Sequence, residues 1–359
     1  MFRIFFIIIL TIQQISYAQV ADDINYKTHF TASKQVIHVL TIDPSKVYIK
    51  AARAIALGSP RATVASIAKH AQAIAAINGG FFKIGTPGDG LPAGVLKING
   101  MWHGIAYKAR GAIGWSTPEN SAVIDILQTK TILQVNQQQF SIHTLNQIPA
   151  AHRLMLFSDS YGKSLKINNS TKITIQHDTI TNLSNQQEII IPNNSYIYAI
   201  GNKIQFSVLN LPIGSPAKVI IQPLPQMHPT HQQKWHNATF ILGGAPVLIS
   251  NRQKITDFSP EKLRNDFINK RRARTAIGIL DNKHWVLVVA EQNNFSGIPG
   301  LTLAELANFM QTLGCIDALN LDGGRSATLY FKEKIINRPE DNFTIRKVSD
   351  ALLILRKNN

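Results

Sequence analysis

Three Gly-Gly pairs interrupt apolar runs along the chain, and they are the strongest feature of its pattern of hydrophobic and polar positions. The runs lie at 75–82 (AAINGGFF), 239–249 (TFILGGAPVLI) and 318–331 (ALNLDGGRSATLYF). Short runs rich in β-branched and aromatic residues predict buried strands. Glycine inside a strand weakens it unless a ligand or another segment of backbone must come close. We therefore expect the three segments to meet at one shared cleft.

The other apolar positions predict further strands and a few helices. Alternation with a period of two predicts a pair of strands over 36–50 and a hairpin over 275–290. Apolar residues at helical spacing predict helices over 63–76 and 301–310, and a last strand follows at 348–355. We therefore expect an α+β fold with a mixed, twisted β-sheet core and packed helices.

The segment 120–229 differs in composition from the rest of the chain, because it is rich in Gln, Asn, Ile and Thr. Alternating stretches at 171–176 and 188–191 predict antiparallel strands, and Pro residues over 210–229 predict edge strands and turns. We expect one domain over 19–359 that carries this segment as a β-rich insert. The histidines in and just beyond it lack metal-ligand spacing, so no metal site is predicted there: His143, His152, His177, His228, His231 and His236.

Residues 1–18 have the pattern of a secretory signal peptide, with one early charge, an apolar run over 4–12 and small residues before Gln19. The run is shorter than the roughly 20 residues that span a membrane, although an uncleaved anchor is an alternative. Cys315 is the single cysteine, so an exported chain would have no intramolecular disulfide and would depend on its core. We expect a secreted protein, located in a bacterial periplasm.

The chain is strongly basic, with 37 Lys and Arg against 21 Asp and Glu. This charge favours an anionic partner such as nucleic acid, phospholipid headgroups, lipopolysaccharide or a phosphodiester. The densest basic run, 270–274, lacks interleaved aromatic residues, and no groove-reading motif accompanies it. We therefore expect no nucleic acid partner, whereas peripheral association with an anionic envelope remains open.

Asp322 is the leading candidate for chemistry. It follows an apolar strand and precedes Gly323 and Gly324, whose successive amides can form an anion-binding nest. Polar or charged neighbours flank this turn: Asn320, Arg325 and Ser326. The alternative is a β-hairpin with a solvated aspartate.

Asn78 opens the first Gly-Gly pair, Gly79 and Gly80, as Asp322 opens the last. Its amide can both donate and accept a hydrogen bond, which suits a sugar hydroxyl or a neighbouring carboxylate. An Asx turn is the alternative for Asn78. Asp89, in a loop rich in Gly and Pro, is a conceivable second carboxylate, and an exposed loop residue is its alternative.

Four motifs, in this order and spacing, resemble the phosphodiester glycosidase family. They lie at 75–82, 240–249, 271–280 (RRARTAIGIL) and 300–331. The resemblance extends over about 75–355, with a poorly matched middle from roughly 120 to 229. The family includes a lysosomal enzyme that removes N-acetylglucosamine from a sugar phosphodiester, and bacterial proteins linked to exopolysaccharide.

The resemblance implies a hydrolase that cleaves the bond between sugar C1 and phosphate, with Asp322 and Asn78 as catalytic residues. Arg274 matches the arginine of the family's R-T-A-I-G motif, and its planar guanidinium can pair with two phosphate oxygens. The alternative for Arg274 is a surface salt bridge. The substrate-binding residues are then Gly79, Gly80, Gly243, Gly244, Arg274, Asn320, Gly323, Gly324, Arg325 and Ser326.

Expulsion of a phosphomonoester needs a general acid less than ordinary glycoside hydrolysis does, because this leaving group is already good. The reaction needs a carboxylate that attacks C1 or activates water, and cations that hold the departing phosphate. Asp322 can be the nucleophile or the base, and a calcium ligand is its third alternative. No cofactor is otherwise predicted.

Arg325 stands where the lysosomal branch of the family has a third glycine. A large cation there makes the cleft smaller or changes its charge. This favours an anionic glycan or glycolipid phosphodiester over an N-acetylglucosamine substrate. The alternative function is a non-catalytic protein of the same fold that binds or assembles exopolysaccharide.

Overall fold

The computed structural model describes residues 24–31, 33–85, 88–106, 108–117, 119–148, 154–201, 211–339 and 344–357. The predicted signal peptide at 1–18 lies outside the described residues. Among the helices of those ranges, none has the length and apolar character needed to cross a membrane.

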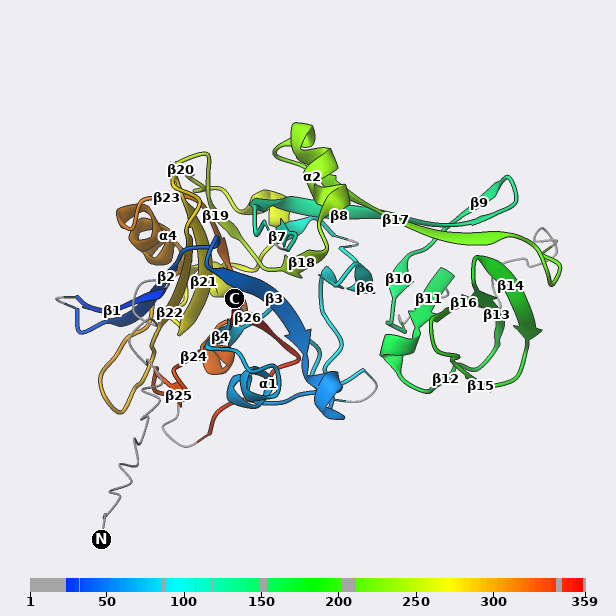
Figure 1. Cartoon of the computed structure of the whole chain (residues 1–359), viewed down its shortest axis with the longest axis horizontal. Coiled ribbons are helices and arrows are strands. Elements are labelled where there is room, and N and C mark those ends of the chain that lie inside the picture. The colour runs from blue at the N-terminus through cyan, green and yellow to red at the C-terminus, as the bar shows by residue number, and fades with distance from the viewer. Residues whose placement is uncertain are drawn as a thin grey trace, which may run out of the picture.

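Three sheets form the body of the molecule (Figure 1). The first sheet has the order β1 (Ile24–Phe30), β2 (Val36–Ile42), β22 (Trp285–Ala290), β21 (Arg274–Leu280), β23 (Cys315–Asn320), β19 (Val247–Ser250) and β20 (Gln253–Lys254). The second has the order β25 (Lys334–Ile335), β24 (Leu329–Phe331), β4 (Ala75–Asn78), β26 (Asp350–Arg356) and β3 (Val47–Arg53). The third has the order β17 (Ala217–Pro225), β8 (Ala122–Val135), β7 (Arg110–Trp115), β18 (Phe240–Gly243), β5 (Leu96–Ile98) and β6 (Met101–Gly104), and β9 (Gln138–Ser141) pairs with β8.

The strand pairs of these three sheets are antiparallel, so the predicted mixed sheet is wrong for the body of the molecule. Consecutive strands often pass from one sheet to another: β2 lies in the first sheet and β3 in the second. The fold is mainly β, and α+β describes it only in the coarse sense that short helices pack on the sheets. Within the described ranges these helices are α1 (Val64–His70), α2 (Gln232–Asn237), α3 (Asn265–Asn269) and α4 (Leu303–Thr312).

The two predicted helices begin at side-chain caps. The hydroxyl of Thr63 accepts from the Ser66 amide at the start of α1, and Thr302 and Glu305 form a capping box at the start of α4. α1 is shorter than predicted because Gln72 has φ +55°, which ends the helix before β4 begins.

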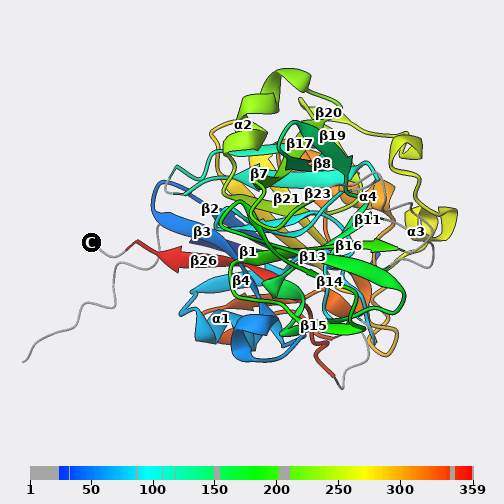
Figure 2. The same ribbon diagram turned by 90° about the vertical axis from the view of Figure 1, so that its right-hand side faces the viewer.

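A β-rich lobe projects from the third sheet, within the predicted insert. The long strands β8 and β17 run outward together. β10 (Thr144–Leu145) and β11 (Leu154–Ser158) form the one parallel strand pair among the described residues. Figure 2 looks onto this lobe. Its other strands are β16 (Ser195–Gly201), β13 (Ser170–Gln176) and β14 (Thr179–Ser184), with the separate pair β12 (Ser164–Lys166) and β15 (Glu188–Ile190).

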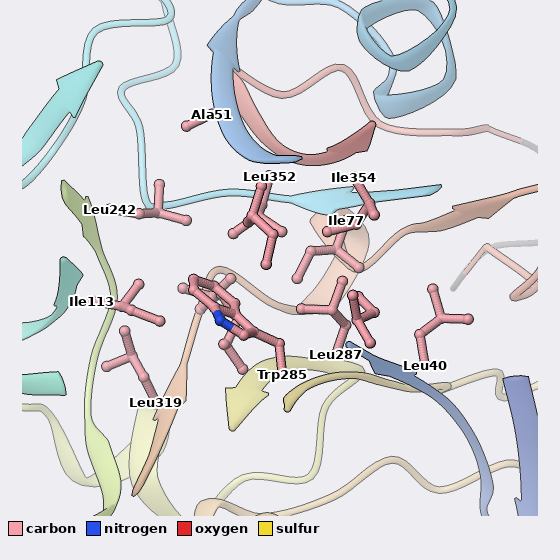
Figure 3. Close-up of a cluster of buried hydrophobic side chains, with 14 of the residues drawn as sticks. Leu40, Ala51, Ile77, Ile113, Leu242, Trp285, Leu287, Leu319, Leu352 and Ile354 are labelled. Atoms are coloured by element: carbon pink, nitrogen blue, oxygen red, sulfur yellow. The ribbon is translucent and has the colours of Figure 1, made fainter. Parts of the chain in front are cut away.

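One apolar core lies between the three sheets of the body (Figure 3). Leu287 comes from the first sheet, Ile77 and Leu352 from the second, and Ile113 and Leu242 from the third. Because burial of such side chains is the main favourable term in folding, this shared core fixes the sheets against one another. It thereby fixes the strand ends at which the Gly-Gly pairs lie.

Candidate functional site

The three Gly-Gly segments lie where the sheets meet. The first follows β4, the second leads from β18 to β19, and the third leads from β23 towards β24. The Asp322 amide donates to the carbonyl oxygen of Gly79 (3.4 Å), and the Ala245 amide donates to that of Asn320 (2.8 Å). The expectation that the segments converge is confirmed, and the hairpin alternative for Asp322 is wrong because β23 and β24 belong to different sheets.

Glycine is required at two of these positions by close approach. A Cβ on Gly79 would lie 1.9 Å from Oδ1 of Asp350, and a Cβ on Gly244 would lie 2.4 Å from the carbonyl oxygen of Asn320. These distances are too short for a Cβ atom, so only glycine fits where the segments are in contact.

Asp350 is a site residue that the sequence analysis missed. It is the first residue of β26 and is 2% exposed. Its Oδ1 accepts a 2.8 Å hydrogen bond from the Gly80 amide, its Oδ2 accepts from the Ser349 hydroxyl, and it pairs across the sheet with Arg53. Burial raises the pKa of Asp350, against the opposing hydrogen bonds and the charge of Arg53. The one available signal was a polar Ser-Asp pair at the start of the last apolar strand.

Asp322 is half-buried, and burial raises its pKa to about 6. The Ser326 hydroxyl, the charge of Arg346 and the Gly323 amide lower this pKa, while the charge of Asp350 raises it. Asp322 and Asp350 therefore interact electrostatically from either side of the first Gly-Gly turn. Two interacting carboxyl groups with raised pKa values are typical of acid–base sites.

Asn78 connects the parts of this site and has no exposed surface. Its Nδ2 donates to the carbonyl oxygen of Asp322 (2.7 Å), and its Oδ1 accepts from Thr275 Oγ1 (2.8 Å) and from the Thr328 amide (3.1 Å). These contacts engage both ends of the amide, so Asn78 positions the Asp322 turn, and its catalytic role stays a prediction.

Arg274 does not occupy the predicted phosphate-binding position. It is 1% exposed, and its guanidinium donates to the carbonyl oxygens of Leu301 (2.9 Å), Phe267 (3.1 Å) and Lys270 (2.9 Å). The chain at 267–270 covers it, and burial lowers its pKa to about 10. These bonds hold that segment in place, and they leave the guanidinium buried and away from the surface where a salt bridge was the alternative.

The remaining predicted residues surround the Asp322 turn. Asn320 is 1% exposed and donates to the carbonyl oxygens of Ala245 (2.6 Å) and Leu321 (2.8 Å). Its buried side chain therefore stabilises the backbone of the second and third Gly-Gly segments. Gly324 has φ +57° and starts a short 3₁₀ turn that brings Ser326 to Asp322. Arg325 is exposed and donates to Thr344 Oγ1 (3.2 Å).

The other candidate carboxylate, Asp89, has a structural role. It forms an ion pair with Arg61 (3.0 Å) and accepts from the Gly85 amide (2.8 Å). Across the described ranges, no group of three or more His, Cys, Asp or Glu side chains is placed to hold a metal ion. The calcium-ligand alternative for Asp322 is therefore not supported by a cluster of such side chains around it.

A pocket of about 290 Å³ opens beside Asp350 and contains three of the predicted glycines, Gly80, Gly243 and Gly244. Its cations, Arg110, Lys262 and Arg264, were not among the predicted site residues. The rest of its lining is Phe81, Pro92, Ala93, Gly94, Val95, Leu96, Leu242, Ala245, Leu263 and Phe267. The pocket and the carboxylate pair thus share Asp350 and the first Gly-Gly turn.

Comparison with known proteins links this arrangement to one family. A family model described as phosphodiester glycosidase matches residues 162–355, which include Asp322 and Asp350. The mouse N-acetylglucosamine-1-phosphodiester alpha-N-acetylglucosaminidase is 33% identical over 76 residues, which span 21% of this chain and 14% of the mouse protein.

Two solved structures share the fold. A hypothetical protein from Synechocystis is 23% identical, with a TM-score of 0.78 over 93% of this chain and 62% of that one. A protein from Burkholderia pseudomallei is 18% identical, with a TM-score of 0.73 over 89% of this chain and 74% of that one. At these identities the likeness concerns the fold alone.

Proposed function

Because the chain belongs to the phosphodiester glycosidase family, we propose that it hydrolyses the bond between sugar C1 and phosphate in a glycan or glycolipid phosphodiester. The observation that carries this proposal is the pair of buried or half-buried carboxyl groups, Asp322 and Asp350, on either side of the Asn78-Gly79-Gly80 turn. The sugar C1 would lie against Asp322, which is the more accessible of the two.

In the proposed reaction, Asp322 acts in its ionised form. It either attacks C1 to form a glycosyl ester, which a water molecule then hydrolyses to free the sugar and the carboxylate, or takes a proton from a water molecule whose oxygen attacks C1 directly. The bond between C1 and the phosphate oxygen breaks, and its electron pair leaves with the phosphomonoester. Since that group is stable as an anion, nearby cations can support its departure in place of a strong general acid. Arg346 lies on the Asp322 side, and Arg110 lies in the pocket on the Asp350 side.

Release of free sugar from a panel of sugar-1-phosphodiesters tests the proposal. The native protein should release sugar, and Asp322→Asn should reduce kcat at least about 1,000-fold while the fold is retained, because the variant cannot supply a negative oxygen. Asp281→Asn is the matched control, since Asp281 is exposed in the β21–β22 turn and pairs with Arg252. No release from any substrate, together with glycan binding, would favour the non-catalytic exopolysaccharide-binding alternative.

We also propose that the protein is secreted to a bacterial periplasm and that its positive charge allows peripheral association with an anionic envelope. The pattern of 1–18 and the formal net charge of +16 support this. Cell fractionation with and without residues 1–18 tests the location, and a salt wash tests the association, because screening by salt releases a protein held by surface charge.

A further inference from the structure

The pocket beside Asp350 differs chemically from a sugar-binding site. Of the side chains that the structure places in its lining, none is a neutral hydrogen-bonding group: Ser, Thr, Asn, Gln, Tyr, Trp and His are all absent. Its polar side chains are all charged, one carboxylate and three cations, and the rest of the lining is apolar or glycine. A sugar ring seated there would find partners for its hydroxyl groups only at these charged groups and the backbone, and an unpaired buried hydroxyl costs free energy. The pocket therefore suits a part of the substrate other than the sugar.

The walls of the pocket are apolar and built on rigid elements. Leu242 in β18 of the third sheet and Val95 directly before β5 are buried in its lining. Phe81 and Phe267 form one wall, with their rings edge to face at a centroid distance of 5.9 Å, and Leu263 lies half-buried near them. Such a lining favours an alkyl chain, which gains free energy from each methylene that leaves water.

A fixed cation lies in the same pocket. The Arg110 guanidinium donates to the carbonyl oxygens of Ala109 (3.0 Å) and Glu261. Glu261 is itself held, because its carboxylate accepts from the amides of Gly111 and Val247, each at 2.8 Å. These contacts hold Arg110 in a pocket whose lining also contains the carboxylate Asp350 and the apolar walls.

We propose that this pocket binds the aglycone side of the substrate, and that the aglycone is an alkyl chain attached to a phosphate held by Arg110. The substrate is then a glycolipid phosphodiester, with the sugar on the Asp322 side and the chain in the pocket. This inference rests on the proposed hydrolysis at C1. It goes further by assigning the sugar to one side of the site and the aglycone to the other.

A matched series of substrates tests it. Esters with one sugar 1-phosphate and a methyl, butyl or octyl group, used below their micelle concentrations, should differ in kcat/KM. The expected rise is about fourfold per buried methylene, and the octyl ester should exceed the methyl ester at least about 30-fold. Turnover with equal kcat/KM for the methyl and octyl esters would overturn the inference and leave the proposed function intact.

Leu263→Asn makes the pocket lining more polar and leaves Asp322 and Asp350 unchanged. It should reduce the octyl-to-methyl ratio of kcat/KM at least about tenfold, whereas Leu313→Asn, at a half-buried leucine after α4 and away from the pocket, should leave the ratio as it is. An unchanged ratio in Leu263→Asn would contradict the placement of the chain.

Binding of octyl phosphate keeps the test independent of turnover. Calorimetry should show at least about 30-fold tighter binding of octyl phosphate than of methyl phosphate, and weaker binding of both to Arg110→Met. If no ester is hydrolysed but this preference is found, the proposed reaction fails and the pocket assignment stands. If the esters are hydrolysed and the two phosphates bind equally, the pocket assignment fails.

Discussion

The side-chain amide of Asn78 donates a 2.7 Å hydrogen bond to the backbone carbonyl of Asp322, which lies 244 residues further along the chain. This bond joins the end of β4, in the second sheet, to the turn that leaves β23, in the first. The same amide accepts from Thr275 and Thr328, so one buried side chain sets the position of the Asp322 turn relative to both sheets.

Replacement of Asn78 by Ala should therefore affect stability and catalysis together. The buried Thr328 amide and the Asp322 carbonyl would each lose a partner, at a cost of about 2–4 kcal/mol in the free energy of unfolding. We expect kcat to fall about 10- to 100-fold, because the Asp322 turn is no longer held. Urea unfolding and kinetics check both effects, with Asn294→Ala at an exposed position as the control. A variant with native stability and activity would show that this bond does not set the position of the turn.

The pH dependence of kcat/KM reports the charge state of Asp322. With a pKa of about 6, the ionised form becomes the majority above that pH, so activity should rise through about pH 6 and then level off. A fall in activity above pH 6 would instead assign Asp322 as a general acid. Carbon NMR titration of the aspartates, in the native protein and in Asp350→Asn, checks the coupling, because loss of the neighbouring charge should lower the pKa of Asp322.

The same carboxyl group should reduce the stability of the fold at neutral pH. Its pKa in the folded protein, about 6, exceeds the usual 3.8, so the folded state holds this proton more tightly than the unfolded chain does. The resulting stabilisation is complete below about pH 3.8 and is lost as the pH rises through 6. Asp322→Asn, which cannot ionise, should therefore be more stable than the native protein at pH 7, by about 1–3 kcal/mol in urea unfolding. A lower stability of the variant at pH 7 would contradict this account.

Gly79→Ala should displace Asp350, because the new Cβ would lie 1.9 Å from its Oδ1. We expect activity to fall at least about 100-fold, together with a loss of stability of about 2 kcal/mol or more. Gly297→Ala is the comparison, since its Cβ would meet no atom within 4 Å and the change brings only the strain of φ +68°. Equal behaviour of the two variants would mean that the close approach at Gly79 is not needed.

The sequence predicted the structure correctly where a local backbone geometry requires one residue type. Glycine pairs inside apolar runs predicted close approach, and the capping box predicted the start of α4, because both depend on short-range geometry. Asp350 was not predicted as a site residue, because the sequence around it does not show that the last strand lies beside the first Gly-Gly turn. The burial of Arg274 could not be predicted, because the sequence does not show that residues 267–270 fold over its guanidinium. The antiparallel order of the sheets depends on long-range pairing in the same way.

Sugar release by the native protein, Asp322→Asn and Asp350→Asn, measured on one sugar-1-phosphodiester at pH 7, tests the central claim most directly. Asp281→Asn serves as the control, and circular dichroism confirms that each variant is folded. The account predicts release by the native protein and the control, and a loss of at least about 1,000-fold in Asp322→Asn and at least about 100-fold in Asp350→Asn. Release by Asp322→Asn or Asp350→Asn at the native rate would contradict the assignment of the carboxylate pair as the active site.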